Sequence, residues 1–131
     1  MRFDTYPFID FVKSVESHIL DFNPDVLFTH SRSEVNIDHK ITLDAVEAAC
    51  RPVRKECPSH IFSFEIVCSG SWTFNKSFIP NLFVDITNFW DLKLLAWSFF
   101  VDESRSFPFP RSNMGLETLA KYRGMMCGVN Y

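Results

Sequence analysis

Four side chains that can bind a metal or handle protons lie close together in the sequence: His30, Asn36, Asp38 and His39. Imidazole is the commonest protein ligand of zinc, and a ligand histidine usually donates its second ring N–H to a carboxylate or a carbonyl. A catalytic zinc ion takes three protein ligands, however, and this stretch offers at most two. Asp38 and Asn36 are also good N-cap residues. Spacing alone therefore leaves two interpretations open, a metal or polar-substrate site and a well-capped loop with two incidental histidines.

The same stretch is predicted to run from a strand through a loop into a helix. Residues 26–28 form a short apolar run typical of a strand buried on both faces, and Thr29 and His30 would stand at its carboxyl end. Residues 41–51 are predicted to be helical, and Pro52 to end the helix. The apolar residues of this helix share one face: Ile41, Ala45, Val46 and Ala49. Ligands of open α/β sheets bind outside the carboxyl ends of the strands, so the four polar side chains would lie near a binding crevice.

The rest of the chain is predicted to alternate helices and strands, as in parallel α/β packing. Residues 8–19 have the apolar spacing of an amphipathic helix, and residues 61–67 alternate as in a half-exposed strand. A further strand is expected at residues 82–86, and residues 88–100 form a helix so apolar that it must be deeply buried or part of an interface. Residues 107–110 are expected to be extended, because each proline restricts the residue before it. A last helix is predicted near the carboxyl end, and three of its side chains are expected to face the interior: Leu116, Leu119 and Ala120.

The composition is that of a single globular domain. The chain has 131 residues, of which 47% are hydrophobic and 16% aromatic, including 15 Phe. This length supports one hydrophobic core, and so much apolar surface excludes a disordered chain and must be covered by something. The net charge of -3 comes without a basic patch, which argues against a nucleic-acid partner.

The cysteines and the apolar segments bear on the cellular compartment. The four cysteines form no Cys-x-x-Cys pair, which favours thiols in a reducing compartment over disulfides. The amino-terminal residues mix charged and apolar side chains, so they lack a signal-peptide core, and no later apolar run reaches the roughly 20 residues of a membrane span. We therefore expect a cytoplasmic protein without a transmembrane segment.

Several segments together resemble one known family. Residues 24–30, residues 34–39 and the helix that ends at Arg51 and Pro52 look like the second signature block of the LmbE-like, or PIG-L, metal-dependent N-deacetylases. Segments similar to the carboxyl half of the family follow in the same order: residues 78–86, Lys93, residues 110–112 and residues 119–124. The resemblance covers nearly all of the 131 residues, and the combination is more specific than any single segment.

The resemblance implies an α/β fold, a Rossmann-like three-layer sandwich with a mainly parallel sheet, and a zinc-dependent N-deacetylase of N-acetylated amino sugars or sugar conjugates. It places His39 as the third metal ligand and gives Asn36 and Asp38 catalytic positions. Asn36 stands where some members carry a His that stabilises the oxyanion or protonates the leaving amine, and an asparagine can donate a hydrogen bond but cannot transfer a proton. His30 and Arg111 are expected to contact the substrate or a metal ligand. Departures from the family pattern include Glu34 in place of an Asp, and none is expected to touch His39.

One part of the family pattern has no counterpart in this sequence. The first signature of the family, Ala-His-Pro-Asp-Asp, supplies two metal ligands and the general base, and no such stretch occurs among the 131 residues. The chain is therefore expected to be one incomplete deacetylase domain, residues 1–131, that lacks the first strands of the sheet, the amino-terminal metal motif and the extreme carboxyl terminus. The chain alone is expected to be inactive. It is also expected to associate, either with further copies of itself as a homo-oligomer or with a missing amino-terminal half. The alternatives are a non-catalytic fragment or interaction protein, and one chain of a two-chain enzyme.

Overall fold

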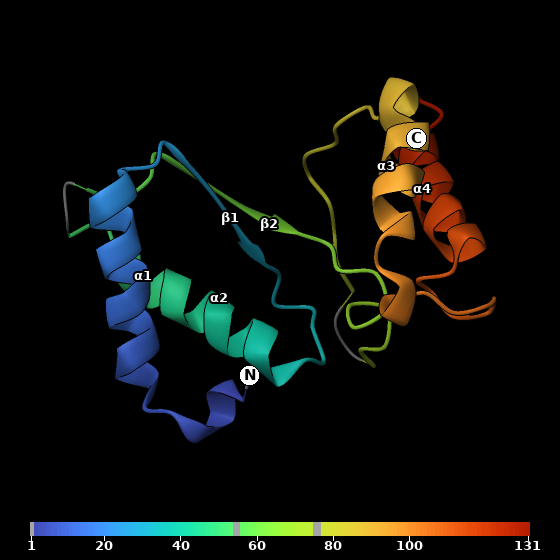
Figure 1. The fold of residues 1–131 in the computed structure, drawn as a ribbon. Coiled ribbons are helices and arrows are strands. Elements are labelled where there is room, and N and C mark those ends of the chain that lie inside the picture. The colour runs from blue at the N-terminus through green and yellow to red at the C-terminus, as the bar shows by residue number, and fades with distance from the viewer. Residues whose placement is uncertain (1, 54–55, 75–76) are drawn as a thin grey trace. The chain divides into compact units, whose positions relative to one another are not determined.

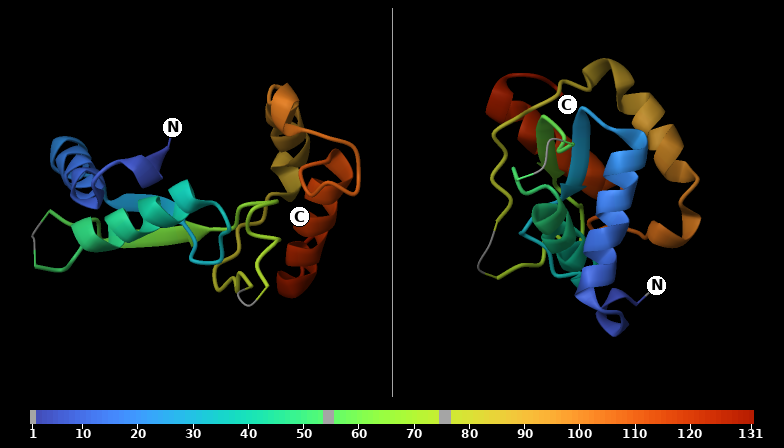
Figure 2. Two further views of the ribbon diagram at one scale, coloured as in Figure 1. Left: turned by 90° about the horizontal axis from the view of Figure 1, so that it is seen from below. Right: turned by 90° about the vertical axis from the view of Figure 1, so that its left-hand side faces the viewer.

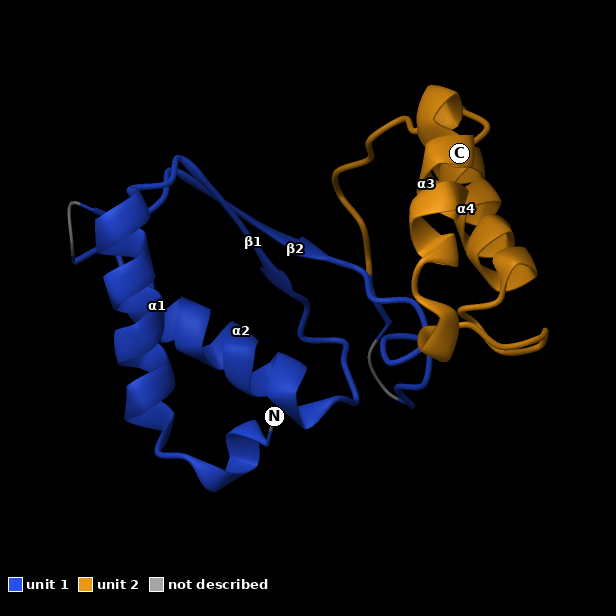
Figure 3. Ribbon diagram, viewed as in Figure 1, with its two compact units in different colours: residues 1–78 blue, residues 79–131 orange. Residues whose placement is uncertain are grey.

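The computed structural model describes residues 2–53, 56–74 and 77–131 (Figure 1). The chain divides into two compact units, Met1–Phe78 and Ile79–Tyr131 (Figure 3). The elements of the first unit are η1 (Phe3–Thr5), α1 (Phe8–Phe22), β1 (Val26–His30), α2 (Ile37–Ala49) and β2 (His60–Phe64). Among the described residues, no helix is both long enough and apolar enough to cross a membrane.

The first unit is a mixed α/β structure in which a two-stranded parallel sheet packs against helices. The register runs from Val26 opposite His60 to His30 opposite Phe64. The connection between the strands passes through α2, so the three elements form a β-α-β unit (Figure 1). The predicted succession of strand, loop and helix after residue 26 is therefore confirmed. Parallel strands need such a crossover because their amino ends lie at the same edge of the sheet.

The core of the first unit lies where α1 and α2 pack together (Figure 2). Its buried members are Val12 and Ile19 of α1 with Ala45 and Ala49 of α2, and Leu27 of β1 packs against them. Small alanine side chains let two helices approach closely, and the longer Val and Ile side chains fill the space between them. The apolar faces predicted for both helices are thus the faces that the structure buries.

Helix α1 confirms the amphipathic helix predicted at residues 8–19 and continues to Phe22. It begins after Pro7, whose fixed backbone angle suits the entry into a helix. It ends at Asn23, which has a φ of 47°, in the left-handed region, and donates its backbone N–H to the carbonyl oxygen of Ile19 at 2.8 Å. Asparagine tolerates this conformation better than most residues, and the turn it makes leads the chain into β1.

The sheet has one open face, which corrects the prediction that the strand at residues 26–28 is buried on both faces. Side chains alternate along a strand, so Leu27 faces the helices and Phe28 points away from them. Phe28 is 68% exposed, and its ring lies beside that of Phe62 on β2, with ring centroids 5.6 Å apart. Helix α2 packs on β1, and α1 and η1 pack in turn on α2. Strand β2 is also shorter than predicted, because it ends at Phe64, opposite the last residue of β1.

The second unit is helical. Its elements are η2 (Thr87–Phe89), α3 (Trp90–Ser98), η3 (Val101–Glu103) and α4 (Asn113–Cys127). Trp90 is buried, and its ring stacks on that of Tyr131 with centroids 4.5 Å apart. The backbone N–H of Ile86 donates to the carbonyl oxygen of Tyr131 at 3.0 Å, so the segment before α3 is tied to the residue at the end of the chain. Helix α4 is capped by Ser112, whose hydroxyl accepts the backbone N–H of Gly115 at 2.9 Å.

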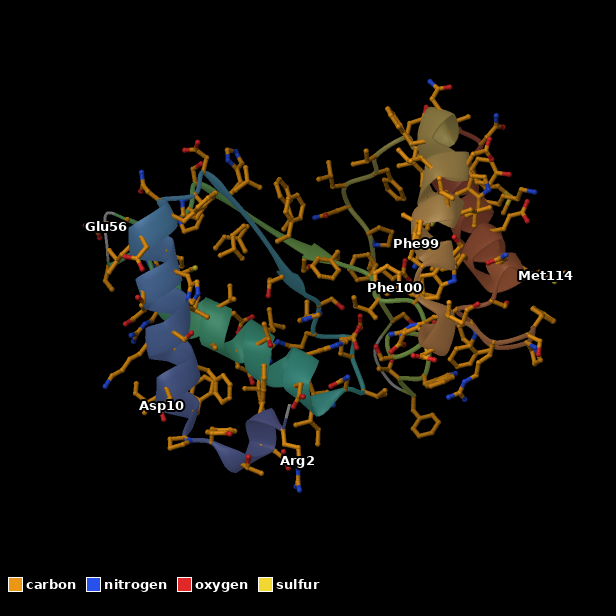
Figure 4. All side chains as sticks on the ribbon, in the orientation of Figure 1. Arg2, Asp10, Glu56, Phe99, Phe100 and Met114 are labelled. Carbon is orange, nitrogen blue, oxygen red and sulfur yellow. The ribbon has the colours of Figure 1, made fainter. Side chains whose placement is uncertain are left out.

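Two predictions for this unit are wrong. The described residues 82–86 form no strand, because a strand requires a partner to satisfy its backbone groups and none pairs with this segment. Residues 107–110 turn instead of running extended, since the N–H of Phe109 donates to the carbonyl of Ser106 and the N–H of Ser112 to the carbonyl of Phe109. The apolar helix predicted at residues 88–100 corresponds to η2 and α3, where Leu92 and Leu95 are exposed, and the side chains of Phe99 and Phe100 just after α3 are exposed as well (Figure 4). Of the two alternatives for that helix, deep burial is wrong, and an interface stays a prediction.

Candidate functional site

The candidate site lies at the edge of the sheet where both strands end. Because β1 and β2 are parallel, the loop after His30 and the loop after Phe64 leave the sheet side by side. The two loops are joined by a hydrogen bond of 3.2 Å from the backbone N–H of Val35 to the carbonyl oxygen of Ser69. The loop after β1 then enters α2, whose first turn carries His39. The stretch thus lies at the carboxyl ends of the strands, and the binding crevice expected there stays a prediction.

His39 is held by a buried carboxylate. The side chain of Glu34 is fully buried, and its Oε2 lies 3.0 Å from Nδ1 of His39, which is itself 21% exposed. An ionised carboxylate only accepts hydrogen bonds, so this contact favours a proton on Nδ1 of His39 and leaves Nε2 as the ring nitrogen that could bind a metal. The expectation that Glu34 does not touch His39 is therefore wrong. The loop between the two residues bends enough to bring a side chain from before the helix against its first turn.

His30 and His39 are stacked face to face. Their ring centroids are 4.0 Å apart and their planes differ by 3°. A zinc ion bound to imidazole lies close to the plane of the ring, about 2.0–2.1 Å from the nitrogen. Two parallel planes share no such point, so these rings cannot bind one metal ion together in this arrangement. The structure thus brings the two histidines together as neighbours and gives them different roles.

His30 sits in the less polar position of the two. Its Nδ1 is buried and has no hydrogen-bond partner among the described residues. Burial lowers the pKa of His30 below its usual value, and the charge of His39 lowers this pKa further, while the carboxylate of Glu34 acts in the opposite direction. The ring also contacts Phe64, at a centroid distance of 5.3 Å. His30 is therefore harder to protonate than a free imidazole, and its ring lies against that of His39.

Asn36 and Asp38 organise the start of the helix. The side-chain Oδ1 of Asn36 accepts the backbone N–H of Asp38 at 2.9 Å, so Asn36 is the N-cap and α2 begins at Ile37 rather than at the predicted residue 41. The carboxylate of Asp38 accepts the backbone N–H of Phe3 in η1 at 3.0 Å. Of the two residues considered as caps, Asn36 has that role, and its side-chain amide group remains available to donate a hydrogen bond.

Arg111 belongs to the second unit, where its guanidinium forms an ion pair with the carboxylate of Glu103. This salt bridge is local, because the two residues flank the turns between η3 and α4. The expected role of Arg111 toward a substrate stays a prediction.

Several buried polar atoms around the site accept or donate no hydrogen bond within the described part of the chain: Thr29 Oγ1, His30 Nδ1, Glu34 Oε1 and Ser69 Oγ. Buried polar groups are rarely left without partners, and these four atoms all belong to residues at the ends of the strands or in the loops that follow them. Sequence reasoning predicted the turn at residues 69–71 but did not place Glu34 or Ser69 in the site. The available signal was the presence of a carboxylate a few positions before a histidine at a helix start, which is a weak pattern by itself.

The donor set fits one metal ligand. His39 presents a single imidazole nitrogen whose ring is oriented by a carboxylate, as is usual for histidines that bind metals. Among the described residues, no group of three or more His, Cys, Asp or Glu side chains is placed to hold a metal ion. All four cysteines are described, and none forms a disulfide. No family model, no curated protein and no solved structure matches the chain.

Proposed function

We propose that this chain contributes one metal ligand, His39, to the active site of a zinc-dependent hydrolase. The observation that carries the proposal is the contact between the buried carboxylate of Glu34 and Nδ1 of His39, at 3.0 Å. A carboxylate on one ring nitrogen fixes the tautomer and directs the other nitrogen outward, which is the arrangement expected of a metal-binding histidine. An ordinary surface histidine has no need of such a partner.

We infer the reaction class, N-deacetylation, from the sequence segments that resemble the LmbE-like family. The substrate would be an N-acetylated amino sugar or a conjugate of one. The proposed fold is the Rossmann-like sandwich of that family, with strands beyond β1 and β2. The open face of the sheet supports this part of the proposal, since parallel sheets are normally covered on both faces.

The residues of this chain would have distinct tasks in such a site. A bound zinc ion supplies Lewis-acid chemistry, polarising a carbonyl and activating water. The side-chain amide of Asn36 can donate a hydrogen bond to a developing oxyanion, while its oxygen is already engaged in the helix cap. His30 excludes water from one face of His39 by stacking on it. Asp38 anchors η1 to the first turn of α2, so it orders the backbone that carries His39.

The remaining ligands and the general base would come from residues outside this sequence, on the same polypeptide or on a second chain. An interaction protein without catalysis is the second candidate, and the observation that favours it is the same exposed apolar face of the sheet around Phe28. Both proposals predict that the 131-residue chain alone releases no acetate from an N-acetylglucosamine derivative. Zinc-dependent release of acetate by this chain alone would contradict both.

The decisive experiment measures zinc in a completed site, defined as this chain fused to, or mixed with, an amino-terminal segment that carries the missing His-Pro-Asp-Asp residues. After dialysis against a weak chelator, elemental analysis should give stoichiometric zinc for the unaltered chain and none for His39→Ala. His30→Ala should weaken zinc binding by at most about 10–100-fold, because it removes a neighbour and not a ligand. Asp38→Asn should fall between these two variants.

A completed site that binds no zinc, or one in which His39→Ala retains zinc while His30→Ala loses it, would contradict the assignment of His39. The exposed His18, whose Nδ1 lies 2.7 Å from the carbonyl oxygen of Ser14 in α1, offers a matched control. His18→Ala should leave the zinc content unchanged.

A further inference from the structure

We propose that Glu34 is the positioning residue of His39 and that Gly70 is the residue that lets the loop after β2 close over its carboxylate. The inference deepens the proposed function and rests on it for the identity of the ligand, because it specifies which group presents Nε2 of His39 to the metal. The contact itself is a property of the first unit alone. It can therefore be tested in the chain without any metal.

The burial of Glu34 makes His39 its principal partner. The residue is 2% exposed, and a buried carboxylate is unfavourable unless it is paired or hydrogen-bonded. Its Oε1 has no hydrogen-bond partner among the described residues, so the bond from Oε2 to His39 Nδ1 is the one that offsets its burial. The nearest arginine in the sequence does not serve this purpose, since Arg32 pairs with Asp44 and Glu47 on the exposed side of α2.

The loop after β2 approaches Glu34 at a glycine. A Cβ atom on Gly70 would lie 2.7 Å from the carbonyl oxygen of Ile66, 3.3 Å from that of Ser33 and 3.4 Å from Oε1 of Glu34. The backbone N–H of Gly70 donates to the same Ile66 carbonyl at 3.0 Å, so the loop turns tightly there. Any larger side chain would clash with the Ile66 carbonyl within the turn, so the turn beside Ser33 and Glu34 would have to change shape. Glycine at this position thus allows the turn after β2 to lie beside the buried carboxylate that contacts His39.

The prediction is a fixed tautomer of His39. Above about pH 8, where free imidazole is neutral, the ring of a metal-free histidine chooses between a proton on Nδ1 and a proton on Nε2. Free histidine favours the Nε2 proton, whereas a carboxylate on Nδ1 reverses that preference. We expect His39 in the unaltered 131-residue chain to carry its proton on Nδ1, as measured by the ¹⁵N chemical shifts of its ring nitrogens.

Glu34→Gln removes the charge and keeps the shape of the side chain. It should lower the Nδ1-protonated fraction of His39 and, in the completed site, weaken zinc binding by about 10–100-fold. Gly70→Ala should act in the same direction by displacing the loop. Glu47→Gln is the matched control. Glu47 is an exposed carboxylate on α2, the helix that carries His39, and it contacts Arg32 instead of His39. This substitution should change neither measurement.

The outcomes separate this inference from the proposed function. Protonation of His39 on Nε2 in the unaltered chain would overturn the inference, and this holds even if Glu34→Gln fails to fold. An unchanged tautomer in a folded Glu34→Gln variant would overturn it as well. If the tautomer depends on Glu34 but the completed site binds no zinc, the positioning of His39 stands and the proposed function fails.

Discussion

The N-cap of α2 gives the sharpest prediction, because the effect of Asn36 on stability can be measured separately from its proposed contact with the oxyanion. Asn36→Ala removes the oxygen that accepts the backbone N–H of Asp38 at 2.9 Å. Asn36 is exposed, so the truncation leaves no buried cavity and its cost is that of the cap, about 1 kcal/mol. With a urea dependence of about 1–3 kcal/mol/M, the unfolding midpoint should fall by about 0.3–1 M. The measurement is urea unfolding followed by far-ultraviolet circular dichroism.

Asn36→Ser is the matched control for this prediction. Serine is as good an N-cap as asparagine, so the free energy of unfolding of this variant should stay within about 0.5 kcal/mol of that of the unaltered chain. Serine lacks the side-chain amide, however, so both variants should lose the oxyanion contact in a completed site. Equal midpoints for all three proteins would show that the cap bond contributes nothing, and a serine variant as unstable as the alanine variant would show that the oxygen is not what matters.

Two further predictions concern exposed and buried groups of the first unit. Phe28→Ser should reduce self-association in sedimentation and reduce the binding of an apolar dye, since Phe28 is a major exposed side chain of the open sheet face, whereas Phe74→Ser outside the sheet should change both less. A monodisperse monomer that binds no dye would contradict this prediction. Burial, and then the charge of Cys57, raise the pKa of Cys50, so iodoacetamide should modify the exposed Cys127 before Cys50 in a time course read by peptide mass spectrometry. Faster modification of Cys50 would contradict it.

The helices and strands that could be predicted are those whose pattern of apolar and polar residues lies entirely within their own segment. The apolar spacing of residues 8–19 is enough for α1, since one stripe of side chains meets α2 at Ala45 and Ala49. The order of strand, loop and helix from Val26 onward was also readable, because an apolar run, a polar loop and a second period follow one another. The predicted start of α2, residue 41, lies past both candidate caps. The structure has Asn36 as the N-cap, while Asp38 accepts the backbone N–H of Phe3, far away in the sequence.

What could not be predicted depends on partners. The alternation of apolar and polar side chains at residues 82–86 is typical of a strand. A strand forms, however, only where another strand pairs with its backbone groups, and the pattern within the segment does not indicate whether such a partner is present. The candidate site shows the same limit. The types of His30 and His39 indicated metal chemistry, while their stacking and the contact with Glu34 depend on how the loop folds back. Gly70 is remote from both histidines in the sequence, and it is the shape of its turn that places it beside Glu34.

The parallel register of β1 and β2 also has a consequence for how the first unit folds. Val26 can pair with His60 only after the chain has closed a long loop through α2, and this closure costs entropy before any ladder hydrogen bond forms. Helices α1 and α2, in contrast, are built from contacts between near neighbours and can form early. We therefore expect strand pairing to be the slow step of folding. Until it is complete, the loops after His30 and Phe64 are not joined, and the carboxylate of Glu34 has no shelter from water.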